Sequence, residues 1–147
     1  MDLVTYPNPV LRMPTSQVSP GTDLTKIIAE MRAVMQINGG IGIAAPQVGL
    51  SLDLFIAQDK VYINAVLSNL RGRCGRVEAC LSIPGIRYLV MRPEQITVKA
   101  YNDKWELVEF EAEGLAARVI CHESDHCRGV LFIDYIPPGT RRLLMGE

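Results

Sequence analysis

The sequence feature that most constrains the fold is residues 113–129, EGLAARVICHESDHCRG, which hold both histidines of the chain. Four side chains follow one another there at steps of four, three and four residues: Leu115, Val119, His122 and His126. This spacing places all four on one face of an α-helix. Because the first two are apolar, that face points into the protein. The sequence therefore predicts a helix that carries two histidines toward the core.

Histidines four residues apart on one helix face can bind a single metal ion, and a glutamate next to the first can act as general base on a metal-bound water. Residues 122–126, HESDH, fit this H-E-x-x-H pattern. Taken alone, the pattern is equally compatible with two core histidines beside a solvated acidic edge. The two interpretations differ in one requirement, because a catalytic metal site needs a third protein ligand.

No third histidine is available for that role. A longer form of the pattern, H-E-x-x-H-x-x-G-x-x-H, has Gly129 in place but Phe132 at its last position, and phenylalanine cannot bind a metal. The third ligand must therefore be a carboxylate or a thiolate. Four cysteines at irregular spacing are expected to be free thiols: Cys74, Cys80, Cys121 and Cys127. A purely structural zinc site would need a fourth ligand, and hence Cys121 or Cys127 as well.

Length and composition limit the number of domains, the classes of binding partner and the location of the protein. With 147 residues the chain is predicted to form a single domain, 1–147, that can bury a substantial core. Its 15 basic and 16 acidic residues include no block of like charge, so we expect no direct binding to nucleic acid or to an anionic membrane. No stretch has the length and apolarity of a membrane span, and the start lacks a secretory pattern. We expect a location in the cytosol or an organelle matrix.

The remaining chain favours strands, with a second helix outside them. Residues 5–20 contain four prolines, which predicts an extended arm rather than a helix. Apolar residues at helical spacing predict a helix over 24–38, capped by Thr22 or Asp23. The other expectations are strands at 52–57, 60–67, 86–90, 95–101 and 106–112, a polar turn at 69–75 and no substantial element over 140–147.

Between the predicted outer helix and the first strand lies GIGIAAPQVG, residues 40–49. Its glycines allow the backbone to approach another group closely. The segment is not typical of a phosphate loop, since no Lys-Ser or Lys-Thr follows. Gln47 is its only side chain with both a donor and an acceptor, so we expect Gln47 to contact a substrate carbonyl.

Three stretches together resemble the motifs of the peptide deformylase family: GIGIAAPQ at 40–47, EACLS at 78–82 and HESDH at 122–126. Their order and separations are similar to the family's pattern. The likeness extends to YPNPVLR near the start, to Asn64 and to GVLFID after the helix. One departure stands next to a candidate cysteine, where Ala79 replaces the family's glycine. The others are Ala65, Cys121 and Cys127.

The resemblance implies an α+β fold with antiparallel β-sheets wrapped around a central, metal-binding H-E-x-x-H helix. It also implies an enzyme, a metallohydrolase that acts on a linear amide. The reaction would be hydrolysis of the N-formyl group from the N-terminal methionine of newly synthesised polypeptides, a step of protein biosynthesis. Because the sequence ends soon after Pro138, the resemblance is to short forms without a long C-terminal helix, phage-encoded ones among them.

Carried over residue by residue, the family's metal ligands correspond to Cys80, His122 and His126. The metal would be one divalent ion, with Fe(II) expected in cells and Zn, Ni or Co as alternatives, because a thiolate with two imidazoles suits each of them. The resemblance makes Glu123 the general base, so that a metal-bound hydroxide attacks the formyl carbon. It also assigns the side-chain amide of Gln47 and the backbone N–H of Leu81 to the developing oxyanion.

The resemblance further implies a pocket for the methionine side chain and for the peptide beyond it. The corresponding residues are Ile41, Gly42, Ile86, Leu115 and Val119, with Arg87 further along the peptide. Ordinary core packing is the alternative role for the apolar members. Asp125 is expected either to orient a metal ligand or to pair with an arginine such as Arg92.

The expected partner is an N-formylmethionyl peptide, including nascent chains at the ribosome. We expect a monomer in the cytoplasm, either the bacterial cytosol or, for a phage-encoded form, the host cytosol. An alternative from another class is a catalytically impaired, deformylase-like metal-binding module, which Ala79 alone favours. A third interpretation is a peptidase that acts on free N-termini, but no acidic group suited to hold the ammonium is evident.

Overall fold

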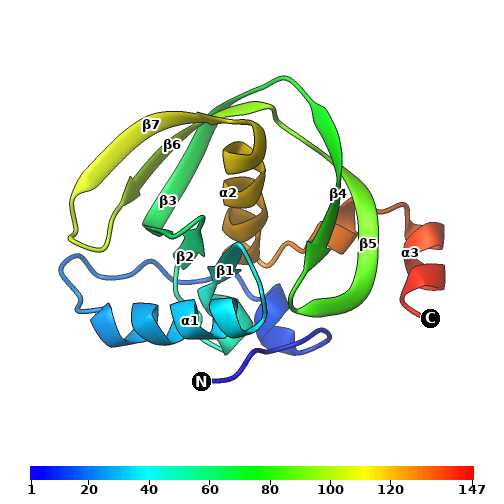
Figure 1. The fold of residues 1–147 in the computed structure, drawn as a ribbon, viewed down its shortest axis with the longest axis horizontal. Coiled ribbons are helices and arrows are strands. Elements are labelled where there is room, and N and C mark those ends of the chain that lie inside the picture. The colour runs from blue at the N-terminus through cyan, green and yellow to red at the C-terminus, as the bar shows by residue number, and fades with distance from the viewer.

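Two antiparallel sheets and the predicted histidine helix, α2 (Gly114–His126), make up the centre of the computed structural model, which describes residues 1–147 (Figure 1). The larger sheet has five strands in the order β1-β2-β3-β6-β7, and β4 and β5 form a separate hairpin. The strands are β1 (Gly42–Ala44), β2 (Leu54–Ala57), β3 (Lys60–Arg71), β4 (Cys74–Cys80), β5 (Ile83–Arg92), β6 (Gln95–Tyr101) and β7 (Leu107–Glu113). The α+β class and the sheets around a central helix, as predicted, are confirmed.

Helix α2 packs into the concave side of the five-stranded sheet. Alternate residues of β6, Ile96 and Val98, are fully buried and share one apolar cluster with Ala117 and Ile120 of the helix. Burying each such large aliphatic side chain stabilises the fold by roughly 1.5–3 kcal/mol. The helix that carries the histidines is therefore held by apolar packing along its length.

Helix α1 (Thr25–Ile37) crosses the outside of the sheet, as predicted. Its apolar face, including Met31 and Met35, packs in a second cluster with Ile43 of β1. The predicted cap at Thr22 or Asp23 is wrong, because the N-cap residue is Leu24, which makes no side-chain capping bond. Asp23, one residue earlier, accepts a hydrogen bond from the Thr25 backbone N–H at 3.0 Å. This arrangement fixes the segment that follows α1 and leads into β1.

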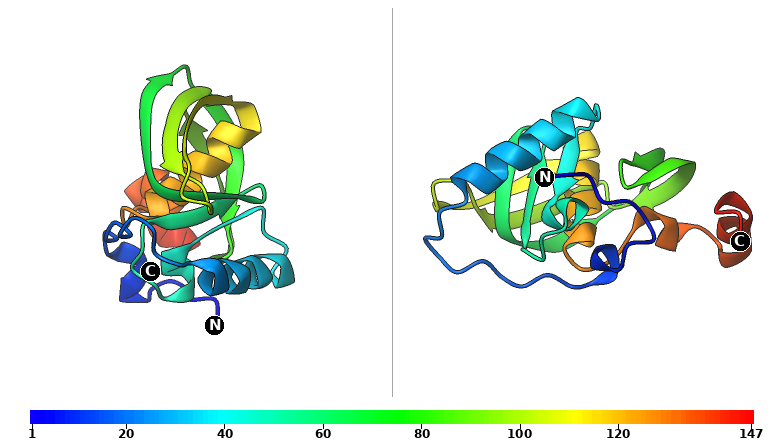
Figure 2. Two further views of the ribbon diagram at one scale, coloured as in Figure 1. Left: turned by 90° about the vertical axis from the view of Figure 1, so that its left-hand side faces the viewer. Right: turned by 90° about the horizontal axis from the view of Figure 1, so that it is seen from below.

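The hairpin β4–β5 lies on the other side of α2 and has its own, smaller apolar cluster. Cys80 and Val90 of the hairpin pack there against Phe132 and Ile133, which belong to the 3₁₀ turn η3 (Phe132–Tyr135). Figure 2 shows the hairpin and the last helix, α3 (Pro138–Leu144), toward the end of the molecule away from α1. The C-terminal segment thus supports the hairpin.

Three local expectations were wrong. The N-terminal arm contains a 3₁₀ turn at Pro9–Arg12, whose start is stabilised by the Asn8 side chain accepting from the Val10 N–H. The last residues form α3, whose first residue is a proline, a position where its missing N–H costs nothing. The predicted polar turn at 69–75 mostly belongs to β3 and β4, because only two residues, with Gly72 at φ +72°, are needed to connect them. None of the helices has the length and apolarity to cross a membrane.

Candidate metal centre

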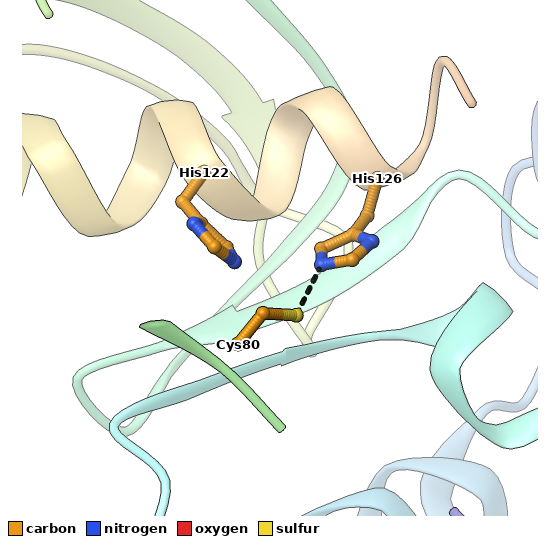
Figure 3. A group of neighbouring side chains, drawn as sticks. All are labelled: Cys80, His122 and His126. Atoms are coloured by element: carbon orange, nitrogen blue, oxygen red, sulfur yellow. Dashed lines mark hydrogen bonds between the residues drawn. The ribbon is translucent and has the colours of Figure 1, made fainter. Parts of the chain in front are cut away.

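Three side chains from two elements meet beside helix α2 (Figure 3). His122 and His126 project from one face of the helix toward Cys80, the last residue of strand β4. Their ligand atoms all lie within 4.8 Å of one another. Cys80 and His126 are buried, and His122 is partly exposed. The helix face that the sequence predicts to point inward therefore meets a cysteine that comes from a separate sheet.

This group of donors fits a divalent metal ion. Metal–ligand bonds of 2.0–2.3 Å in a tetrahedral arrangement put neighbouring ligand atoms about 3.5 Å apart, and Cys80 Sγ lies 3.4 Å from His126 Nε2. One thiolate and two imidazoles leave a fourth position open, as in catalytic sites. Cys121 and Cys127 pack in the core cluster around α2 and are not members of the group. The closed four-ligand site of a structural zinc therefore has no support.

Glu78 on strand β4 orients His122. Its Oε1 lies 2.9 Å from His122 Nδ1, so the ring presents Nε2 toward Cys80 and His126. A carboxylate in this position fixes the tautomer of a metal-binding histidine. The Nδ1 atom of His126 is buried and has no partner. Burial lowers the pKa of His126, which keeps the imidazole in the neutral form that binds metals.

Glu78 is also the centre of a buried charge cluster. Arg92 donates two hydrogen bonds to its carboxylate, at 2.7 and 2.9 Å, and Arg118 donates a third at 2.5 Å. Burial raises the pKa of Glu78, but the hydrogen bonds from His122 and Arg92 outweigh it and lower this pKa to about 2. The Arg92 guanidinium also donates to Asp125 at 2.9 Å. Of the two roles expected for Asp125, the pairing with Arg92 is therefore present.

Glu123 lies on the wall of a cavity beside these residues. Glu123 is 5% exposed, and its Oε1 has no hydrogen-bond partner. Burial raises the pKa of Glu123 to about 7. A Cβ atom at Gly42 would lie 2.5 Å from Glu123 Oε2. The glycine that the resemblance assigns to substrate binding therefore also makes room for the glutamate.

Gln47 is held next to the cysteine by its own hydrogen bonds. Its Oε1 accepts from the Ala44 backbone N–H at 2.9 Å, and its Nε2 donates to Ser82 Oγ at 3.1 Å. Nε2 also lies 3.6 Å from Cys80 Sγ. Because Oε1 is occupied, the amide presents a donor rather than an acceptor to the site. This polarity suits an oxygen that becomes negatively charged.

The cavity has a volume of about 350 Å³ and opens between the glycine segment, strand β4 and helix α2. Its wall includes nine of the residues singled out from the sequence: Ile41, Gly42, Gln47, Cys80, Leu81, Leu115, Val119, His122 and Glu123. Three others are not on this wall. Ile86 packs against the hairpin cluster instead, and Arg87 is exposed on β5. His126 is 1% exposed and is not among the lining residues.

The sequence reasoning did not identify two residues of this site. Glu78 is the first residue of the EACLS motif, and a carboxylate two residues before a ligand cysteine on a strand can face the same side. Arg118 belongs to none of the three motifs. It lies four residues before His122, so helical spacing could have placed it on the same face. Both line the cavity.

Ala79, the departure from the family motif, causes no strain. Its φ is not positive, and its side chain is exposed where it lines the cavity. The strand is simply extended at this point, a conformation that alanine adopts freely.

Comparisons with known proteins agree with this geometry. A family model described as polypeptide deformylase matches residues 1–142. The chain belongs to the peptide deformylase family. The peptide deformylase of Borreliella burgdorferi is 39% identical over 153 residues, which cover 99% of this chain and 93% of the relative. These matches confirm the family that the three sequence motifs indicated.

Solved structures give the same family and fold. A peptide deformylase from Legionella pneumophila matches with a TM-score of 0.93 at 33% identity, covering 99% of this chain and 90% of that one. The enzyme from Thermotoga maritima matches with a TM-score of 0.88 at 38% identity, covering 92% and 97%. Peptide deformylases are hydrolases, and membership supports removal of N-formyl groups from nascent peptides as the reaction of this protein.

Proposed function

We propose that this protein is a metal-dependent peptide deformylase that hydrolyses the N-formyl group of N-terminal methionine, with Glu123 as general base and Cys80, His122 and His126 as metal ligands. The observation that carries the proposal is the convergence of these three ligand atoms, within 4.8 Å, on the cavity that Glu123 lines. A metal ion bound there would polarise the formyl carbonyl and lower the pKa of a bound water. Fe(II), Zn, Ni and Co all suit this donor set.

Glu123 has the properties of a residue that first accepts and then returns a proton. Its pKa of about 7 matches the pH of a cell, at which a general acid or base works best. Its Oε1 is buried and has no hydrogen-bond partner, so no protein donor competes for a proton there. Gly42 lies directly against the other oxygen, Oε2, where a Cβ would be 2.5 Å away. Oε1 can then protonate the leaving amine.

Gln47 and Leu81 are proposed to stabilise the oxyanion. The Gln47 amide is aligned by Ala44 and Ser82, so it need not reorganise as charge develops. Leu81 follows the ligand Cys80 directly, and its side chain lies so close to Gly40 that a Cβ there would be 2.7 Å from Leu81 Cδ1. The backbone N–H of Leu81 adjoins the cysteine because the two residues are consecutive.

The substrate is proposed to insert its methionine side chain between Ile41, Leu115 and Val119, with the peptide passing Gly42. Seven of the 15 residues that line the cavity are hydrophobic. Ile41 and Leu115 are 57% and 53% exposed, which leaves apolar surface for a ligand to cover. Arg87 is proposed to contact the peptide beyond the cavity, and Ile86 to support that region.

We further propose that the protein is a single domain and a monomer. Its proposed location is the cytoplasm, and its proposed substrates include nascent chains.

The test is release of a free amine from a formyl-methionyl peptide by protein prepared without oxygen and loaded with Ni(II) or Fe(II). Glu123→Gln should bind one metal per chain and lose about 10²- to 10⁴-fold in kcat. Glu109→Gln, which alters an exposed glutamate on β7, is the matched control and should keep full activity. A wild type that binds one metal and shows no turnover would instead support the impaired metal-binding module.

A further inference from the structure

Polar side chains make the hydrogen bonds between helix α2 and the hairpin that carries Cys80. No backbone hydrogen bond joins β4 or β5 to α2. The apolar cluster that contains Cys80 and Val90 includes no residue of α2, and the cluster around α2 includes no residue of the hairpin. The relative position of the third ligand and the two histidines therefore depends on a few specific hydrogen bonds.

Arg118 makes the most extensive of these links. From α2 its Nη2 donates to the Cys74 carbonyl at 2.6 Å, and its Nη1 donates to the Val90 carbonyl at 3.0 Å and to Glu78. Cys74 and Glu78 belong to β4 and Val90 belongs to β5. One guanidinium thus holds both strands of the hairpin. Its planar, fixed set of donors suits three acceptors at once, which an ammonium cannot reproduce.

The other links between helix and hairpin each use one strand. Arg92 of β5 donates to Asp125, and His122 contacts Glu78 of β4. Arg118 and Arg92 offset the charges of Glu78 and Asp125, so the buried cluster is close to neutral. Arg118 is 7% exposed and lies one helical turn before His122.

We propose that Arg118 is a positioning residue for the metal centre, which fixes the Cys80 hairpin against the two histidines of α2. This inference rests on the metal site proposed above. In this proposal Arg118 does not contact the metal. Removing Nη2 breaks the hydrogen bond to the Cys74 carbonyl at the start of β4. Cys80, at the end of the same strand, then spends less time within bonding distance of the metal, and the metal leaves faster.

The test uses the full chain loaded with Co(II), whose absorption includes a thiolate-to-cobalt band when a cysteine is a ligand. Arg118→Lys keeps the charge but loses the three-way geometry, and Arg118→Met loses both. We expect Arg118→Lys to release Co(II) to a chelator about 10- to 100-fold faster than wild type, with a weaker thiolate band, and Arg118→Met to release it faster still. Arg76→Lys, the same change at an exposed position of β4, should stay within twofold of wild type.

A control variant that weakens the apolar core separates positioning from general destabilisation. Ile120→Val weakens the core around α2 without touching the hairpin. If Ile120→Val released Co(II) as fast as Arg118→Lys, or if Arg118→Lys matched wild type, Arg118 would have no positioning role. The metal site itself is tested separately, because Cys80→Ala should abolish the thiolate band. A band that persists in Cys80→Ala would overturn the proposed ligand set instead.

Discussion

The two sides of the metal centre are built in different ways. Helix α2 lies in an apolar cluster that it shares with the five-stranded sheet, so dispersion and the hydrophobic effect hold His122 and His126. The hairpin meets the helix through buried charges centred on Glu78. Apolar packing tolerates small changes at modest cost, whereas a buried charge cluster becomes unfavourable when one partner is lost. The hairpin side is therefore the more sensitive half of the site.

The most severe test of this contrast is Glu78→Ala. The substitution leaves the Arg92 and Arg118 guanidinium groups buried without their common carboxylate, and His122 Nδ1 without a partner. Removing one member of a buried charge cluster costs about 3–5 kcal/mol, so we expect that loss in the free energy of unfolding in urea. Glu109→Ala, at an exposed site, should change it by less than about 0.5 kcal/mol. If Glu78→Ala lowered the free energy of unfolding by as little as Glu109→Ala, the hairpin would not be the more sensitive side of the metal centre.

On the helix side, Ile120→Val should have a smaller effect. Ile120 is 2% exposed within the cluster around α2, and removing one buried methyl group typically costs about 0.5–1.5 kcal/mol. The spacing of the two histidines along the helix does not change. We therefore expect a lower midpoint of urea unfolding with wild-type Co(II) release. Faster release would mean that the apolar side also limits metal binding.

Ala79→Gly restores the glycine of the family motif on the hairpin. Because Ala79 is extended and its methyl is exposed, the glycine gains no needed conformation. It loses about 0.5–1 kcal/mol through the greater backbone freedom of the unfolded chain. The measurement is thermal unfolding together with kcat/KM on a formyl-methionyl peptide, which should stay within about threefold. A large gain in kcat/KM would show that the methyl obstructs the substrate.

Low pH should weaken the Arg12–Asp134 ion pair and, with it, the support of the hairpin. Arg12 Nη1 and Asp134 Oδ2 lie 2.6 Å apart, and the two side chains are 38% and 28% exposed. Partial burial raises the pKa of Asp134, but the hydrogen bond from Arg12 outweighs it, and this pKa lies below its ordinary value of 3.8. The pair therefore stabilises the fold above pH 3.8 and loses this contribution as the pH falls below that value.

Asp134→Asn measures that contribution, which for a partly exposed pair is about 0–1 kcal/mol. The difference in urea midpoint between wild type and Asp134→Asn should be largest near pH 6 and shrink toward pH 3. Ile120→Val changes no titratable group, so the difference in urea midpoint between this variant and wild type should not depend on pH. A constant difference for Asp134→Asn would show that the pair contributes nothing through its charge.

Much of the fold and site could be predicted because the signals are local. The spacing of Leu115, Val119, His122 and His126 depends only on the helical repeat, so their common face on α2 could be predicted without any knowledge of contacts. The prediction that this whole face points inward was wrong at Leu115, which is 53% exposed. The alternation of buried and less buried residues in β6 and the apolar face of α1 likewise depend only on the spacing of residues within one element. Family motifs then pointed to Cys80, which lies 42 residues before His122.

The helix with its two histidines, the family and the candidate metal ligands follow from the sequence. The contacts of the hairpin follow only from the tertiary structure. Arg118 reaches Cys74 and Val90, which are 44 and 28 residues away, and no periodic pattern encodes such a pairing. The same holds for Ile86, which packs with the C-terminal segment rather than the cavity. Contacts between residues of different elements depend on how separate sheets and helices pack together. The spacing of side chains along one element carries no information about this packing.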